Sequence, residues 1–493
     1  MGNYWLSKSK IMDGLQCEKR LWMEMHQPEE GEFSEATERL FSTGHRVGEV
    51  ARTFFPGGVL IDTGRDLQAA IDKTRELMAR PGDATLFEPA FEHQGVLARA
   101  DVLVRKRGRL RLVEVKAAGS VKDHYLQDVA IQYWVLRGAG YEPGTVLLEH
   151  IDTSFVYPGK GDYRGLFKLE NLTREAKKLQ DHVPKWIRSF RRMLGGDMPS
   201  IEIGNHCHKP HDCPFIGFCT PQDGPEYPIS ILPYGGRVVE QLREDGFEDL
   251  RDVPEDRLTR ENHLRVWRIT RSGQFEIDPD VAAAIAEHPY PRYYLDFETI
   301  HFSVPIWPGT RPYQQVPYQW SLHIERKDGA LEHREFLDLS ADSPIRRVAE
   351  SLIAAAGKTG PVFAYSHFES TRLRDLAGWC PDLAPKLDAI RNRIVDLLAL
   401  TRRCYYHPEM KGSWSIKMVL PTVAPELEYE SLEVQDGGMA QTAYLEAIDS
   451  GTSSERREAI RLSLLEYCGR DTEGLVRLVQ FFEKSQTAAN VDS

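Results

Sequence analysis

The sequence predicts a mixed α/β protein of about three domains. Its 493 residues exceed one ordinary domain of roughly 150 residues. Apolar residues alternate as in strands in two separate stretches, near 84–116 and near 292–365, and helical spacing separates and follows them. Apolar residues at 41% can build packed cores, and charged residues at 28% are close to the globular average, which excludes wholesale disorder.

The apolar runs and the charge indicate where the protein is located and which classes of partner it could bind. The run VAAAIA at 281–286 falls far short of the roughly 18 apolar residues that span a bilayer, and the N-terminus MGNYWLSKSKIMDG has no apolar segment typical of a secretory signal. We therefore expect a soluble cytoplasmic protein that binds no membrane. The net charge is −12, but residues 101–200 hold 18 Lys and Arg against 12 Asp and Glu, so a polyanion would meet that stretch first.

The first expected domain, residues 1–225, begins with helices and continues with a strand-rich core. Gly and Pro mark the breaks between stretches of helical and strand-like spacing. The expected elements are, in order, helices at 6–26 and 33–54, strands within 84–116 with a turn at Arg107-Gly108, a helix at 123–138, a strand at 147–152 and a helix at 170–195.

Two acidic residues and a lysine stand on the expected strands of this core. Asp101 follows one strand-like stretch, and Glu114 and Lys116 end the next. A tight turn would bring Asp101 beside Glu114, and the period of two puts Glu114 and Lys116 on one face. Carboxylate oxygens suit Mg²⁺ or Mn²⁺, and an adjacent ammonium can orient a water and offset charge on a phosphate. The pattern predicts a phosphodiesterase site; three surface charges on a hairpin are the alternative.

This stretch resembles the RecB-type branch of the PD-(D/E)XK nucleases, in which a helix directly follows the two strands. The resemblance implies that Asp101 and Glu114 bind a divalent metal ion and that both act in catalysis with Lys116. The branch carries Gln-x-x-x-Tyr on that helix, where this chain reads QDVAIQYW and offers Gln132. The branch also carries an upstream Gly-x-x-x-His motif, from which this chain departs. Glu49 stands beside the position of the motif's histidine and is the expected replacement ligand. A glutamate on a helix surface is the alternative there.

Four of the seven cysteines form a pattern typical of metal ligands. Cys207, Cys213 and Cys219 fall at even spacing, and Cys17 stands alone near the N-terminus. Thiolates favour zinc or iron–sulfur clusters, and zinc sites usually use Cys-x₂₋₄-Cys pairs, which this spacing does not contain. Unliganded core cysteines are one alternative. A mixed Cys/His zinc site is the other, because the same loop contains His206, His208 and His211.

The order of these cysteines resembles that of the iron–sulfur RecB-type nucleases. These include the CRISPR-associated adaptation exonuclease and the AddB subunit of a bacterial recombination nuclease. The resemblance implies that Cys17, Cys207, Cys213 and Cys219 hold a 4Fe–4S cluster. Closing a loop of nearly 200 residues would tie the two ends of the domain together, so we expect a structural role for it.

Two further regions are expected after the first domain. Short helical pieces predict a helical connector over 226–285. Strands resume at its end, and helices follow within 370–401 and at 455–483, which predicts a second mixed α/β domain over 286–483. The polar residues 484–493 are expected to form a disordered tail.

The last domain carries a second ordered set of acidic residues. Asp296 and Glu298 end an apolar strand, and the period of two aims both at one face. Glu369 stands at a strand-to-helix junction, and Tyr467 and Asp471 lie four apart on one face of a helix. Four carboxylates can hold two metal ions about 4 Å apart, one activating water and one stabilising the leaving oxygen. Strand-end and helix-surface acids are the alternative for any single motif.

This order resembles the tyrosine-containing DEDD (DEDDy) exonucleases of the DnaQ-like, RNase H-related fold. The resemblance implies that the four carboxylates bind Mg²⁺ or Mn²⁺ and that Tyr467 is catalytic in a 3′–5′ exonuclease. The chain departs from the family pattern at Phe368-Glu369, where the family has Phe-Asp. A carboxylate is retained there with one more methylene.

Over residues 1–483 the chain resembles bacterial fusions of a RecB-like iron–sulfur nuclease, a helical connector and a DnaQ-type RNase H-like exonuclease. The resemblance implies a metal-dependent nuclease with two active sites that cleaves DNA, as single strands or ends, in repair or in anti-phage or CRISPR-type defence. Two alternatives stay open: an RNA 3′–5′ exonuclease, and a catalytically inert iron–sulfur scaffold that binds nucleic acid. Fold similarity does not set the substrate, and the sequence predicts neither protein partners nor an oligomeric state.

Overall fold

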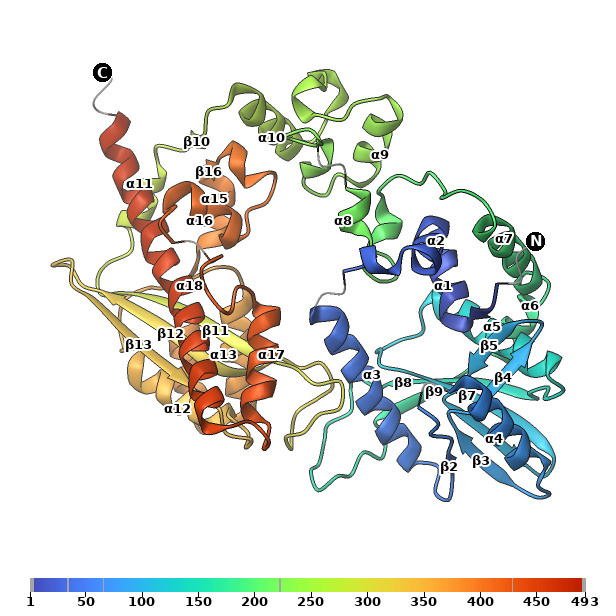
Figure 1. The fold of residues 1–493 in the computed structure, drawn as a ribbon. Coiled ribbons are helices and arrows are strands. Elements are labelled where there is room, and N and C mark those ends of the chain that lie inside the picture. The colour runs from blue at the N-terminus through green and yellow to red at the C-terminus, as the bar shows by residue number, and fades with distance from the viewer. Residues whose placement is uncertain (1–3, 33–34, 65, 221–222, 428, 490–493) are drawn as a thin grey trace. The chain divides into compact units, whose positions relative to one another are not determined.

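The computed structural model describes the chain except residues 1–3, 33–34, 65, 221–222, 428 and 490–493. The chain divides into two compact units (Figure 1). The first unit comprises residues up to 222 together with 301–314, and the second comprises 223–300 and 315–493. Both units combine mixed sheets with helices, so the expected α/β class is confirmed. No described helix is long and apolar enough to cross a membrane.

A six-stranded mixed sheet forms the centre of the first unit, in the order β2-β3-β6-β7-β8-β9. Strand β7 pairs antiparallel with β6 and parallel with β8. A smaller sheet has the order β1-β5-β4. The strands are β1 (Leu6–Ser7), β2 (Val59–Leu60), β3 (Ala84–Phe87), β4 (Ala90–His93), β5 (Val96–Arg99), β6 (Val102–Lys106), β7 (Arg109–Lys116), β8 (Thr145–Ile151) and β9 (Phe167–Asn171).

The β6–β7 hairpin turns where the sequence predicts it. Arg107 and Gly108 both have positive φ, 51° and 74°, as a two-residue type I′ hairpin turn requires. Val102 pairs with Val113, and both are buried in the sheet. This register brings Asp101, which precedes β6, beside the end of β7.

The helices of the first unit differ from the expected ones mainly in where they break. The helix expected at 6–26 is interrupted at Cys17, whose backbone is extended, and the one expected at 170–195 is also two helices. The helix expected at 123–138 is α5. The helices are α1 (Lys8–Gln16), α2 (Glu18–His26), α3 (Glu35–Thr53), α4 (Leu67–Ala79), α5 (Asp123–Gly138), α6 (Thr173–Lys178), α7 (Val183–Leu194) and α8 (Ile216–Cys219).

The second unit is built on a five-stranded sheet in the order β13-β12-β11-β14-β15. Strands β11, β12 and β13 are antiparallel neighbours, and β14 and β15 run parallel to β11. Strand β12 is buried at every position, as a central strand covered on both faces requires. The strands, including the separate β10–β16 pair, are β10 (Glu276–Ile277), β11 (Arg292–Ile300), β12 (Val316–Glu325), β13 (Leu331–Leu337), β14 (Val362–Ala364), β15 (Ile394–Asp396) and β16 (Tyr405–Tyr406).

Helices of the second unit cover this sheet, and helices from the N-terminal part of the unit add to its apolar core. Residues 226–285, expected as a separate connector, belong to this unit, because Leu250 and Val266 share one apolar core with Tyr294 and Phe363 of the sheet. The helices are α9 (Gly236–Glu244), α10 (Glu261–Ser272), α11 (Val281–Ala286), α12 (Ile345–Ala355), α13 (Phe368–Trp379), α14 (Ala384–Arg391), α15 (Leu397–Cys404), α16 (Ile416–Val423), α17 (Gly437–Ile448) and α18 (Ser454–Ala489).

Helix α18 runs into the segment expected as a tail. Residues 484–489 continue the helix, because Lys484, Gln486 and the alanines at 488–489 are good helix formers. Residues 490–493, the rest of the expected tail, lie outside the described residues.

Candidate active sites

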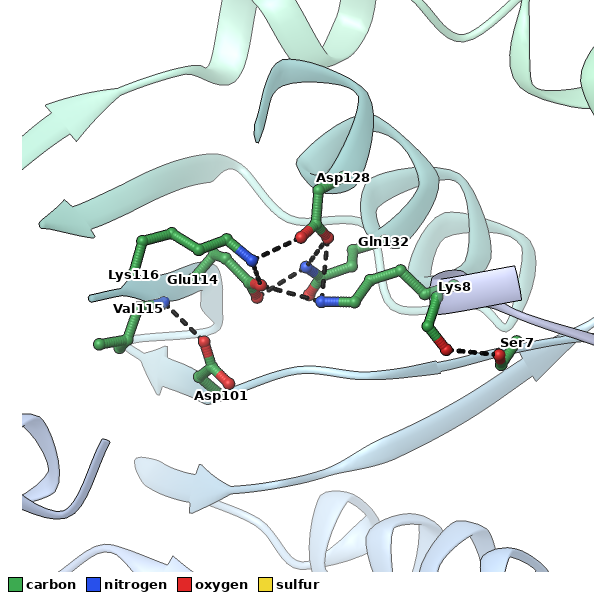
Figure 2. Close-up of polar contacts among 9 residues, drawn as sticks. Ser7, Lys8, Asp101, Glu114, Val115, Lys116, Asp128 and Gln132 are labelled. Carbon is green, nitrogen blue, oxygen red and sulfur yellow. Dashed lines mark hydrogen bonds and ion pairs between the residues drawn. The ribbon is translucent and has the colours of Figure 1, made fainter. Parts of the chain in front are cut away.

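The β6–β7 hairpin brings the first predicted set together (Figure 2). Asp101 Oδ2 accepts a hydrogen bond of 2.6 Å from the backbone N–H of Val115. Glu114 and Lys116 alternate on β7, and Lys116 Nζ lies 2.7 Å from Glu114 Oε1. Asp101, Glu114 and Lys116 therefore meet at the end of two neighbouring strands, which is the arrangement their spacing predicts.

Helices α5 and α1 supply three more side chains to this site. Gln132 Nε2 donates to Glu114 Oε2 at 2.6 Å and to Asp128 Oδ1 at 2.9 Å. Lys8 Nζ lies 2.9 Å from both Glu114 Oε1 and Asp128 Oδ1. Lys116 Nζ completes the arrangement at 2.6 Å from Asp128 Oδ2. The two ammoniums and two carboxylates form a closed ring of alternating charge, which we call the first-site ring: Lys8, Glu114, Lys116 and Asp128.

The charges of the first-site ring support one another. Burial alone would lower the pKa of Lys8 and of Lys116, but the attraction of Asp128 and then Glu114 outweighs it and raises both. Burial alone would raise the pKa of Asp128, but Lys116 and Lys8 outweigh it and lower that pKa. Asp101 differs, because burial and then the charge of Glu114 raise its pKa well above the ordinary value. Asp101 is therefore the carboxyl of the first site that a bound cation would most help to ionise.

Glu49 does not join this site as a third carboxylate. It lies on α3, its side chain is 54% exposed, and its Oε2 is 3.1 Å from Arg46 Nη1. No set of three described acids that includes Glu49 brings its oxygens within 4.8 Å of one another. Helical spacing puts Glu49 on the solvent face beside Arg46, while its neighbour Val50 faces the core.

All four predicted cysteines line one pocket in the first unit. Cys17 comes from the break between α1 and α2, and Cys207, Cys213 and Cys219 come from the segment after α7. Burial raises the pKa of Cys17 and brings that of Cys213 to about 11, so these thiols need a metal or another cation to ionise at neutral pH.

The three histidines of the cysteine segment have different positions. His206 lines the pocket, and its Nε2 lies 3.6 Å from Cys207 Sγ. His208 pairs with Asp212 at 2.8 Å, and the His211 ring packs against His124. Only His206 is placed to join the cysteines as a ligand among the three.

In the second unit, β11 and α18 bring three predicted acids together. Ligand oxygens of Asp296, Glu298 and Asp471 all lie within 4.8 Å of one another. Asp296 and Glu298 alternate on β11, and α18 packs on β11 and β12 so that Asp471 faces them. No other three His, Cys, Asp or Glu side chains among the described residues lie this close.

The remaining predicted residues of the second site surround these acids. Glu369 lies in the first turn of α13, where its side chain is buried and hydrogen-bonds Asp296. Its Oε2 has no hydrogen-bond partner among the described residues. Tyr467, one turn before Asp471 on α18, hydrogen-bonds Asp471. Tyr429, which the sequence did not single out, donates a 2.5 Å hydrogen bond to Asp471 Oδ1. Two tyrosines therefore hold the one carboxylate that α18 contributes.

The acids of the second site repel one another. Burial and then Asp471 raise the pKa of Asp296 to about 8, and burial raises that of Asp471 to about 6 although its tyrosine hydrogen bonds lower it. Burial and then Asp296 raise the pKa of Glu298 and of Glu369 well above the ordinary value. Such a cluster is stable at neutral pH when a cation neutralises it.

These acids open into a pocket of about 290 Å³. Lys417 of α16 lines it, and its Nζ lies 5.5 Å and 5.6 Å from the ring centroids of Tyr429 and Tyr467. The Lys417 ammonium also donates to the carbonyl of Gln435 at 2.7 Å. Sequence reasoning missed Lys417, because no local pattern links α16 to β11 or α18. The other lining residues include Gln315, Phe368, Gly437 and Gln441.

One protein family matches part of the second unit. Residues 293–415 fit the profile of the family described as Domain of unknown function (DUF2779). The matched segment contains Asp296, Glu298 and Glu369, and it ends before α16 and α18. It covers a quarter of the chain.

Curated relatives and a solved structure match other shares of the chain. "Uncharacterized protein MG366" of Mycoplasma genitalium is 23% identical over 215 residues, which are 39% of this chain and 32% of that protein. "Uncharacterized protein UU173" of Ureaplasma parvum is 21% identical over 279 residues, 52% of this chain and 40% of that protein. The chain thus spans about a third to two fifths of the length of these relatives. "Crystal structure of SSO0001" is 12% identical, with a TM-score of 0.24, over 44% of this chain and 87% of that chain.

Proposed function

We propose that the chain is a Mg²⁺- or Mn²⁺-dependent nuclease with two active sites, with DNA as the favoured substrate. The observation that carries the proposal is the second site, where Asp296, Glu298 and Asp471 bring ligand oxygens within 4.8 Å beside two tyrosines and a lysine. Buried acids that repel one another are a poor solution for stability alone. They are suited to holding divalent cations against a phosphodiester.

The roles at the second site follow from position. Divalent ions, when bound, supply an activated water and stabilise the leaving oxygen. Asp296, Glu298 and Asp471 would hold them, with Glu369 close enough to join through its unpartnered oxygen. Tyr467 is placed to orient the attacking water, and the Lys417 ammonium is placed to offset charge on the phosphate. This is the reaction of a DEDDy-type 3′–5′ exonuclease, whose RNase H-related fold we propose for residues 286–483.

The first site supports a second, separate activity. Asp101 and Glu114 would hold a divalent ion, and Lys116 would face the scissile phosphate, as in a RecB-like PD-(D/E)XK nuclease. The β6–β7 hairpin followed by α5 supports that fold, and Gln132 supports the site by fixing Glu114 and Asp128.

We infer that the cysteine pocket holds a 4Fe–4S cluster rather than a single zinc ion. Four thiols line it, which is the donor set that such a cluster uses. Sulfurs around one tetrahedral zinc would lie about 3.8 Å apart, given a Zn–S distance of about 2.3 Å. No three of the described thiols lie within 4.8 Å of one another. Stoichiometric zinc without iron after anaerobic purification would refute this assignment.

The experiment that tests the function uses single-stranded and double-stranded DNA and RNA, each labelled at either end, with and without Mg²⁺ or Mn²⁺. We expect the wild type to release nucleoside 5′-monophosphates from 3′ ends only when the metal ion is present. Asp471→Asn should stop this release. If the chain prefers RNA in all assays, its substrate is RNA and not DNA. If no metal-dependent cleavage is seen, the proposed nuclease activity is wrong.

A matched control separates loss of chemistry from loss of fold. Glu466→Ala removes an exposed acid from the same helix, five residues before Asp471, and should cleave as the wild type does. For the first site, Lys116→Ala is compared with Lys106→Ala, which removes an exposed lysine at the end of β6.

A further inference from the structure

Helix α1 has one of the candidate centres at each end. Its first residue, Lys8, belongs to the first-site ring, and Cys17, which follows its last residue, lines the cysteine pocket. At 1.5 Å per residue, these two residues lie about 13 Å apart along the helix. One short helix therefore joins the two centres within the first unit.

The N-terminal end of α1 contacts the first unit through its cap and through the short strand before it. Ser7 caps it by accepting a 3.2 Å hydrogen bond from the N–H of Lys10, and Leu6 just before it pairs with Val96 of β5. The body of the helix packs closely as well. A Cβ added at Gly14 would lie 2.8 Å from Leu21. Lys8 is the first residue of this helix, so its position depends on how α1 as a whole is seated against its neighbours.

The C-terminal end of α1 is tied to the cysteine segment. Gln16 Nε2 donates 2.7 Å hydrogen bonds to the carbonyls of His206 and His211. Arg20, which lines the cysteine pocket, contacts Gln16 Oε1 at 2.8 Å and Asp13 at 2.7 Å. These contacts join the C-terminal end of α1 directly to the cysteine segment.

At the other end, Lys8 lies where a divalent ion would be attracted. Its ammonium contacts Glu114 and Asp128 at 2.9 Å each, and its charge also acts on Asp101. Asp101 and Glu114 are the proposed ligands of the divalent ion. A positive charge a few ångströms from that ion repels it strongly in a partly buried site.

We propose that Lys8 is a positioning residue of the first site: a built-in cation that orders Glu114 and Asp128, competes with the divalent ion, and is held in place by the cysteine pocket through α1. The inference rests on the proposed function of the first site and of the cysteines. Lys8 therefore sets the metal concentration at which the first site loads. Loss of the cysteine centre loosens Lys8 and shifts that concentration.

The test measures Mn²⁺ binding by electron paramagnetic resonance in the full chain carrying Asp296→Asn and Asp471→Asn, so that binding reports the first site. Lys8→Met removes the charge and keeps the length, and we expect it to tighten Mn²⁺ binding roughly tenfold or more. Lys8→Arg restores the charge and should stay close to the parent. Lys10→Met is the matched control, because Lys10 lies on the same helix but pairs with Glu24. Lys8→Gln carries the same expectation should Lys8→Met fail to fold.

The coupling is tested by adding Cys17→Ser to the parent and to Lys8→Met. In the parent, we expect Cys17→Ser to lower iron content and to tighten Mn²⁺ binding. In the Lys8→Met chain, it should lower iron content by the same amount and leave Mn²⁺ binding unchanged, because the competing cation is already gone.

The outcomes separate the inference from the proposed function. Unchanged or weaker Mn²⁺ binding in Lys8→Met overturns the inference alone, as does an equal effect of Cys17→Ser in both chains. If neither the parent nor Lys8→Met binds Mn²⁺, the inference and the proposed first site both fail. Binding by Lys8→Met but not by the parent supports the inference in its strongest form.

Discussion

The two candidate sites hold their carboxylates in opposite ways. In the first unit, the carboxylates of Glu114 and Asp128 alternate with the ammoniums of Lys8 and Lys116 in a closed ring. In the second unit, Asp296, Glu298 and Asp471 face one another, and two tyrosine hydroxyl groups hydrogen-bond Asp471. The first site largely balances its own charge, whereas the second does not.

The two sites therefore differ in how far they depend on metal ions from solution. A balanced ring keeps its shape without a metal ion, and a divalent cation must compete with lysine to enter it. Burial raises the pKa of every acid in the second site, and neighbouring acids raise that of Asp296, Glu298 and Glu369 further, so a bound cation would stabilise their ionised forms. We therefore expect the second site to depend on divalent ions for both activity and stability, and the first for activity alone.

The largest expected effect is that of removing a ligand from the unbalanced site. Asp471→Asn keeps the size of the side chain but removes its charge, and should lower 3′-end cleavage at least about a thousandfold, because several kcal/mol of charge stabilisation is lost. The rate of mononucleotide release under single-turnover conditions is the measurement. A loss of less than tenfold would show that Asp471 is not a ligand.

A smaller effect is expected from the hydroxyl groups that hold Asp471. Tyr467→Phe should slow cleavage roughly ten- to a thousandfold, the range of positioning and general acid–base effects. Tyr429→Phe should cost less, about tenfold, since Tyr467 and not Tyr429 is the residue proposed to orient the attacking water. Comparing kcat with KM for both variants checks this, and an equal effect of the two would remove the special role of Tyr467.

The pH dependence of stability should show the smallest effect and should separate the two sites. Free aspartate has a pKa near 3.8, while that of Asp296 is about 8 and that of Asp471 about 6 in the folded chain. Between pH 4 and 8 the folded state holds protons that the unfolded state releases, so stability without metal falls as pH rises. Mg²⁺ should therefore raise the Tm more at pH 8 than at pH 5, by on the order of a few degrees.

The control for this pH effect is the Asp296→Asn/Asp471→Asn chain. In this chain, the gain in Tm from Mg²⁺ should be nearly the same at pH 8 and at pH 5, because the second-site acids cause the difference. A Mg²⁺-dependent gain in Tm that is as large at pH 5 as at pH 8 would contradict the proposed imbalance of the second site.

The sequence predicts the parts of both sites that lie on one strand or one hairpin. Asp101, Glu114 and Lys116 follow from the tight turn at Arg107-Gly108, and Asp296 and Glu298 follow from strand alternation. These predictions succeed because the period of two and a short turn fix the geometry locally. Asp128 could also have been found, since it lies four residues before Gln132 on the same face of α5.

The parts that distant elements bring in could not be predicted from local pattern. Lys8 and Lys417 reach their sites only through the packing of α1 and α16, and neither stands in a motif. Glu49 shows the opposite case, since it stands close to a motif position in the sequence while the helix turns it to solvent beside Arg46. Side chains on separate elements become neighbours through tertiary contacts that no spacing rule contains.

If the two metal-dependent sites are independent, the second should keep its activity when the first is disabled. The Lys116→Ala chain, in which only the second site is intact, is given a DNA strand with a 3′-terminal phosphorothioate and an unblocked strand, both in Mg²⁺. We predict that the unblocked strand is shortened from its 3′ end at the wild-type rate and that the blocked strand is shortened far more slowly. Equal digestion of both strands would show that the second site is not a 3′-end exonuclease, and no digestion of either by a folded Lys116→Ala chain would show that the two sites are not independent.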